Sequence, residues 1–202
     1  MPRRDTKSCI QTIAQELVSQ QGLDALSFDA IAARLGTSKQ AVLYWYPSKA
    51  ELMLALFLPW LRAEVAAARE ALEAANTPAE AVHNFATAIA AFHTADLERF
   101  RAMYLLPQTT RQSPQAFFDR ADFPQVHEIS DQLYSCLAAK LGGDPPENRR
   151  AAFTLHTSVL GIVMMVALSD RLQDPLAHST DDLIATLVGR FCATGPATPG
   201  EG

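Results

Sequence analysis

Two short helical patterns on either side of a glycine turn, between residues 27 and 46, constrain the fold of this chain most strongly. Ser27 is a typical N-cap, and the apolar residues after it recur at helical spacing until Gly36. A second pattern begins at Ser38 and ends before Pro47. Neither helix is long enough to be stable alone in water, so both must pack on a shared core. Two helices joined by a tight, glycine-containing turn are typical of a helix-turn-helix.

Apolar residues at helical spacing continue along the rest of the chain, whereas the alternation typical of strands never persists. The sequence therefore predicts an all-α protein of about nine helices. Gly22 indicates a helix end, Thr77 and Glu80 form a capping box, and Pro124 must interrupt or restart a helix. The segment 108–124 fits no single pattern. We expect helices at about 10–21, 27–35, 38–46, 48–75, from 78, 96–106, 126–141, 145–172 and 180–192.

Charge is divided unevenly along the 202 residues, whose net charge is -5. Residues 1–50 hold six Lys/Arg against four Asp/Glu, while the remainder holds 11 against 18. A polyanion would therefore meet the N-terminal quarter. No signal-peptide pattern opens the chain, and the longest uninterrupted apolar run, 159–168, is shorter than the roughly 20 residues that cross a bilayer. We expect a cytoplasmic protein.

Metal and catalytic patterns are missing from the sequence. Its three cysteines lie far apart, and its five histidines have no metal-site spacing. The sequence contains no Gly-rich phosphate loop or GxSxG elbow. We expect no metal, no cofactor and no enzymatic activity.

Polar and aromatic residues in and around the second short helix suit DNA contacts. Lys39 and Gln40 lie in its first turn, where their side chains can donate to guanine and pair with adenine. Hydroxyls, helix N-termini and ammonium groups nearby can bind phosphates without reading sequence. Asp29 would repel a phosphate, and we assign it to compensation of the helix dipole. The predicted DNA-binding residues are Ser27, Ser38, Lys39, Gln40, Tyr44, Trp45, Tyr46, Ser48 and Lys49.

Residues 10–52 resemble the TetR family of bacterial regulators without a gap. The match rests on Ser27, Leu35-Gly36, Ser38-Lys39 and the string YWYPSK that ends at Lys49. Leu43 stands where the family most often has tyrosine, and Trp45 stands where histidine is commoner. The resemblance therefore leaves the base or phosphate roles of Tyr44 and Trp45 open by one position in the sequence.

The resemblance implies a DNA-binding domain at residues 1–50 and a helical effector-binding and dimerisation domain at 51–195. Composition predicts a disordered tail at 196–202. The segment 149–170 is apolar on nearly all sides and must be covered on more than one face. Pairing with the last helix in a homodimer would cover it and would match a pseudo-palindromic operator. The predicted dimer residues are Phe153, Leu160, Met164, Leu183 and Leu187.

In the TetR family the effector pocket lies among the middle helices, and the resemblance implies the same place here. For each candidate residue the alternative is an ordinary place in the core. An aromatic, methionine-rich lining would suit a small apolar or aromatic effector. The candidates are Trp60, Phe85, Phe92, His93, Met103, Tyr104, Phe117, Tyr134 and Met164.

Taken together, these features predict a ligand-responsive transcriptional regulator that binds its operator as a dimer and is released by the effector. Repression is the family's usual mode, but residues 27–49 do not distinguish repression from activation. The alternative is a helical small-molecule-binding protein or enzyme with a vestigial DNA-binding domain. Asp29 and the small positive balance of residues 1–50 favour that alternative.

Overall fold

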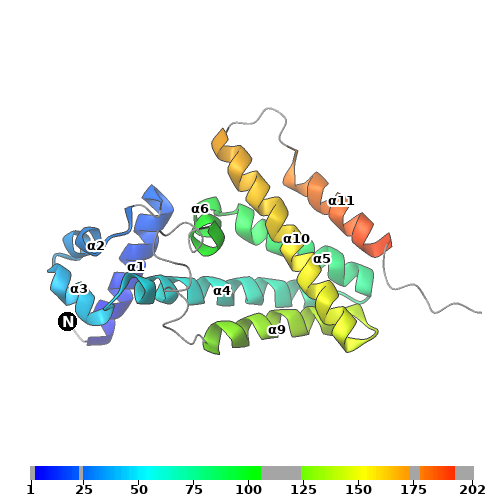
Figure 1. Cartoon of the computed structure of the whole chain (residues 1–202), viewed down its shortest axis with the longest axis horizontal. Helices are drawn as coiled ribbons and strands as arrows, with labels where there is room; N and C mark the ends of the chain where they lie inside the picture. The colour runs from blue at the N-terminus through cyan, green and yellow to red at the C-terminus, as the bar shows by residue number, and fades with distance from the viewer. Residues whose placement is uncertain (1–2, 23–24, 106–123, 173–177, 194–202) are drawn as a thin grey trace, which may run out of the picture. The chain divides into compact units, whose positions relative to one another are not determined.

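A computed structural model describes residues 3–22, 25–105, 124–172 and 178–193. Within these ranges the chain forms nine α-helices and one π-helical turn, with no strand (Figure 1). The prediction of an all-α protein of about nine helices is confirmed. The elements are α1 (Arg3–Gln21), α2 (Phe28–Leu35), α3 (Lys39–Trp45), α4 (Lys49–Glu73), α5 (Pro78–Thr94), α6 (Leu97–Phe100), η2 (Arg101–Leu105), α9 (Pro124–Leu141), α10 (Pro145–Leu172) and α11 (Thr180–Ala193).

The chain groups into two compact units. The first comprises residues 1–62 and 96–126, and the second comprises residues 63–95 and 127–202. Helix α4 passes from one unit to the other three residues after Pro59, which lies inside the helix. The spatial division therefore differs from the predicted boundary at residue 50, because the first turns of α4 pack with the helices before them. The assignment of DNA binding and effector binding to separate domains stays a prediction.

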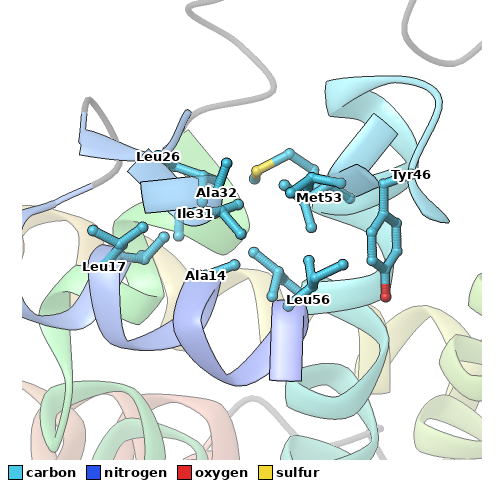
Figure 2. Close-up of a cluster of buried hydrophobic side chains, with 13 residues drawn as sticks. Ala14, Leu17, Leu26, Ile31, Ala32, Tyr46, Met53 and Leu56 are labelled. Atoms are coloured by element: carbon cyan, nitrogen blue, oxygen red, sulfur yellow. The ribbon is translucent and has the colours of Figure 1, made fainter. Parts of the chain in front are cut away.

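The core of the first unit is built from one face of each of the short helices, together with α1 and the start of α4 (Figure 2). Ile31 and Val42, from α2 and α3, are both completely buried. Because each of these helices has only about two turns, this burial supplies the stability that the isolated helices lack. The buried members are Ile10, Ala14, Leu17, Val18, Leu26, Ile31, Ala32, Val42, Tyr46, Leu52, Met53, Leu56 and Ala102.

The turn between α2 and α3 has the geometry that the sequence predicts. Ser27 caps α2 by accepting a hydrogen bond from the amide of Ala30 at 3.1 Å. Gly36 ends that helix with φ +68°, in the left-handed region, and Ser38 begins α3 by accepting from the amide of Ala41 at 3.2 Å. The chain thus passes from α2 to α3 through a short turn, and the glycine and the serine caps fix how the two helices join.

The second unit is organised by α5, which packs against both α10 and α11. Its N-terminus has the predicted capping box, in which Thr77 accepts from the amide of Glu80 and Glu80 accepts from the amide of Thr77. The face of α5 that includes Phe85 and Ile89 is completely buried. Helix α5 therefore forms the centre of this unit.

Two predicted segments differ from the structure. The expected helix at 96–106 is a single α-helical turn capped by Asp96, and it continues as the π-helical turn η2. Pro124 restarts the chain as the first residue of α9, two residues before the predicted start. Most of the ambiguous segment 108–124 and the predicted disordered tail lie outside the described residues.

Helix α10 extends well beyond the uninterrupted apolar run at 159–168. Over Pro145–Asp170 it is long and apolar enough to cross a membrane by length and composition alone. Only 33% of its most apolar window is buried. One such helix is weak evidence for a membrane span. Part of its apolar surface is exposed.

Replacement of Gly36 by alanine should destabilise the protein through its backbone. A Cβ atom at this position would meet nothing within 4 Å, so the whole penalty comes from the positive φ. We expect the free energy of unfolding, measured by urea denaturation, to fall by about 1 kcal/mol. Gly189, inside α11, also has open space around it but no positive φ. Gly189→Ala should raise stability by up to about 1 kcal/mol, and equal effects at the two positions would contradict this account.

Candidate nucleic-acid interface and a buried polar centre

The outer face of α2 and α3 exposes most of the residues predicted to bind DNA. Ser27, Ser38, Lys39, Gln40 and Lys49 are exposed. Trp45 and Ser48 are half-buried, and Trp45 also packs against the core of the first unit. The structure thus places the two candidate base-reading side chains, Lys39 and Gln40, side by side at the start of an exposed helix.

The three serines of this surface are all N-caps. The hydroxyls of Ser27, Ser38 and Ser48 accept hydrogen bonds from the amides of Ala30, Ala41 and Glu51. A serine hydroxyl that accepts in this way still has its own hydrogen to donate. Each can therefore order a helix and donate to a phosphate oxygen at the same time.

The aromatic run 44–46 divides between surface and core. Tyr44 is 67% exposed, and its ring forms a T-shaped contact with that of Trp45, with centroids 5.4 Å apart. Tyr46 is only 2% exposed and belongs to the hydrophobic core drawn in Figure 2. Its predicted role as a phosphate contact is therefore wrong for this conformation. Only Tyr44 of the three presents most of its ring to solvent.

Asp29 has a partner that the sequence analysis did not identify. It lies in the first turn of α2, where the helix dipole stabilises a carboxylate, as predicted. Its Oδ2 atom also lies 2.8 Å from the Nζ atom of Lys39, so the two form an exposed ion pair.

A second candidate site lies inside the second unit, where three polar side chains are buried together. Glu64 and His93 are completely buried, and His156 is 4% exposed. The Oε1 atom of Glu64 lies 2.9 Å from Nε2 of His156 and 3.4 Å from Nε2 of His93. The hydroxyl of Tyr134 lies 3.0 Å from Nδ1 of His156. We call these four residues the polar centre; they come from α4, α5, α9 and α10.

The hydrogen-bond directions in the polar centre follow from its carboxylate. Burial alone would raise the pKa of Glu64, but hydrogen bonds from His156 and His93 and the charge of the two rings lower it to about 2. The ionised carboxylate can only accept, so Nε2 of His156 donates to it. On the other side of the same ring, Nδ1 of His156 and the Tyr134 hydroxyl share a hydrogen bond. Burial, followed by the charge of Glu64, raises the pKa of Tyr134, which keeps that hydroxyl protonated.

The structure separates the predicted pocket residues into groups. Phe85 and Tyr134 both pack against His156, with ring centroids 5.9 and 5.6 Å from its ring. Phe92 packs in the same way against His93 at 5.1 Å. Met164 instead lies exposed on α10. Trp60, Met103 and Tyr104 belong to the first unit, and Phe117 lies outside the described residues.

Glu64 and His156 were missed by the sequence analysis, although a signal for Glu64 was present. Glu64 follows Leu61 by three residues and precedes Ala68 by four, so it occupies the apolar stripe of α4. A carboxylate at such a position needs a buried partner. Among the described residues, no group of three His, Cys, Asp or Glu side chains could hold a metal ion.

The predicted dimer residues lie on α10 and α11 with unequal exposure. Phe153 is 54% exposed, whereas Leu160, Leu183 and Leu187 are half-buried. Met165 and Leu168, which the prediction omitted, are also exposed on α10. Helical spacing places these two with Phe153 and Met164 within one arc of the helix. We call this set, Phe153, Met164, Met165 and Leu168, the apolar face of α10.

The comparisons with known proteins agree with the geometry of the first unit. Residues 12–56 match the family model of bacterial regulatory proteins of the tetR family. The chain is 27% identical over 175 residues to the uncharacterised HTH-type transcriptional regulator YezE of Bacillus subtilis (strain 168), which covers 80% of this chain and 87% of YezE.

Two solved structures share the fold. The transcriptional regulator FadR of Bacillus subtilis, solved in complex with stearoyl-CoA, is 14% identical with a TM-score of 0.68, covering 94% of this chain and 99% of FadR. The multidrug binding protein EbrR, solved with imidazole, is 22% identical with a TM-score of 0.65, covering 98% of each chain.

The buried charge of Glu64 should make stability depend on acid. Its folded pKa of about 2 lies below its ordinary value of 4.5, so its contribution is complete above 4.5 and is lost as the pH falls toward 2. Glu64→Gln should lower the free energy of unfolding near neutral pH by about 3 kcal/mol. The difference from the wild type should shrink as the pH falls below 4.5.

Urea denaturation over this pH range checks the expectation. Glu70, exposed on the same helix, provides the matched control Glu70→Gln. If the free energies of unfolding of Glu64→Gln and the wild type differed by the same amount at every pH, the pKa of Glu64 would not be lowered in the folded protein.

Proposed function

Because the chain is a TetR family transcriptional regulator with a helix-turn-helix DNA-binding segment, we propose that it binds a pseudo-palindromic operator as a homodimer and is released by a small effector. Repression is the mode we propose, following the usual behaviour of the family. The operator would be bound by residues 1–50, and the effector by residues 51–195. The protein would act in the cytoplasm and without catalysis.

The observation that carries DNA binding is the exposed first turn of α3. Lys39 and Gln40 extend from it, and Tyr44 extends from its next turn. The caps at Ser27 and Ser38 and the glycine turn hold α3 against α2, as entry into a major groove requires. We propose base contacts for Lys39 and Gln40, and phosphate contacts for Ser27, Ser38, Tyr44, Ser48 and Lys49. Trp45 would support Tyr44 through their ring contact.

The apolar face of α10 supports dimerisation. Exposed apolar patches on soluble proteins commonly mark surfaces that a partner covers. A second copy would bury this face together with the half-buried Leu160, Leu183 and Leu187. The same pairing explains why so apolar a helix need not lie in a membrane.

The polar centre and the rings around it support effector binding in the second unit. Buried ionisable groups with shifted pKa values are commoner at functional sites than elsewhere. Phe85, Phe92 and Tyr134 surround the two histidines and would favour an apolar or aromatic effector. FadR and EbrR were both solved with small molecules bound. Effector binding here would rearrange the hydrogen bonds of Glu64, which lies on the helix that also enters the first unit.

Alanine substitution of the two lysines should separate base reading from phosphate binding. The probe is a duplex that the wild-type protein enriches from a randomised pool, compared with a scrambled duplex of the same composition. Lys39→Ala should weaken binding to the enriched duplex by about tenfold or more. Lys49→Ala should weaken both duplexes alike and reduce the slope of log K against log salt by about one.

Fluorescence anisotropy at several salt concentrations measures both effects. Arg150→Ala, which removes an exposed charge from the second unit, is the control and should change neither quantity. Wild-type affinity in both lysine variants would contradict the proposed interface.

A charge placed in the apolar face of α10 should prevent dimerisation. Met164→Glu would bury a carboxylate between the two copies, where burial of an unpaired charge is costly. We expect a monomeric mass by analytical ultracentrifugation and weaker operator binding. Ala139→Glu, on the exposed side of α9, should remain dimeric. A dimeric Met164→Glu variant would place the dimer interface elsewhere.

A further inference from the structure

The ion pair between Asp29 and Lys39 places a negative charge on the surface that is proposed to meet DNA. The two side chains are 70% and 50% exposed, and 2.8 Å separates Oδ2 of Asp29 from Nζ of Lys39. Resting on the proposed function, we propose that Asp29 is a positioning and specificity-determining residue. It holds the ammonium group of Lys39 for operator DNA and weakens binding to all other DNA.

The local fold fixes both ends of this pair. Asp29 lies in the first turn of α2, and Lys39 is the first residue of α3. The caps at Ser27 and Ser38 and the left-handed turn at Gly36 set the spacing of the two helix starts. The carboxylate therefore accompanies the first turn of α3 wherever that helix binds.

Stability does not account for the pair. An ion pair between two exposed side chains contributes little to folding. Another ion pair of the first unit, between Arg34 and Glu16 at 3.8 Å, joins α1 to the end of α2 and does not include a predicted base-reading residue. Asp29 thus differs from Glu16 in its partner, although both carry the same charge.

On DNA that lacks the operator, the pair should reduce binding. Nonspecific affinity comes almost entirely from Lys and Arg that neutralise phosphates. A carboxylate in contact with Lys39 cancels the charge of this lysine and repels phosphates itself. Asp29 therefore removes about one favourable charge contact per protomer from nonspecific binding.

On the operator, the same contact should help. A free lysine side chain loses rotamer entropy when one conformation is selected. Asp29 has already restricted Lys39 before the DNA arrives, so less entropy is lost when the ammonium donates to a guanine edge. The ammonium group of Lys39 has three donors, so one can stay with the carboxylate of Asp29 while the others donate to base acceptors. Both effects raise the ratio of operator to nonspecific affinity.

The test measures affinity for the enriched duplex and for the scrambled duplex at several salt concentrations. For Asp29→Asn we expect stronger binding to the scrambled duplex, a salt slope steeper by about one per protomer, and an affinity ratio that falls by about tenfold. Glu16→Gln removes the same charge from the same unit and should leave the ratio unchanged. Asp29→Glu keeps the charge of the first turn and should preserve the wild-type slope.

A double-mutant cycle shows whether Asp29 acts through Lys39. In the Lys39→Gln background, Asp29→Asn should leave the affinity ratio almost unchanged, because the group that it positions is missing. A ratio that is equal in the wild type and Asp29→Asn would overturn the inference. It would also be overturned if Glu16→Gln lowered the ratio equally, or if the effect persisted without Lys39.

This inference and the proposed function fail in different ways. A wild-type protein that enriches no duplex would overturn the proposed function and the role of Asp29 with it. A protein that enriches a duplex, but whose affinity ratio does not depend on Asp29, would overturn the inference alone.

Discussion

The hydrophobic core beneath α2 and α3 is the constraint on which the surface of the first unit depends. Each of these helices has only about two turns and would not persist in water by itself. Burial of Ile31 and Val42 against α1 and the start of α4 keeps them folded. The turn at Gly36 then fixes their relative direction. A surface that must fit a groove can be made from short helices only because the core beneath them holds them in place.

The same core explains how the aromatic run 44–46 divides. Successive helical positions differ in direction by more than a quarter of a turn, so Tyr44 and Trp45 point different ways, and Tyr46 follows as the C-cap, where the backbone leaves the helix. Tyr46 joins the core, Trp45 bridges core and surface, and Tyr44 extends into solvent. The charged residues follow a similar rule, because the starts of α2 and α3 bring Asp29 to Lys39 across ten positions of sequence.

The second unit depends on an interaction of the opposite kind. A completely buried carboxylate would be unfavourable alone, yet Glu64 lies between two imidazole rings, one of which is held by Tyr134. Each of four helices thus contributes one side chain to the polar centre around this carboxylate. Movement of any of them would change the surroundings of Glu64, and α4 enters both units. Packing against α5 covers one side of α10, while its apolar face stays open.

The sequence by itself determined the elements, because their signals are local. Helical spacing of apolar residues predicted nine helices, and the caps at Ser27, Ser38, Ser48 and Thr77 lie where their residue types indicate. Only the tertiary structure decided which side chains meet. His156 approaches Glu64 across 92 positions and Lys39 approaches Asp29 across ten, distances at which no pattern of spacing applies. The burial of Tyr46 was also decided there, since a phenol suits a phosphate contact or a core equally well until the neighbouring helices are in place.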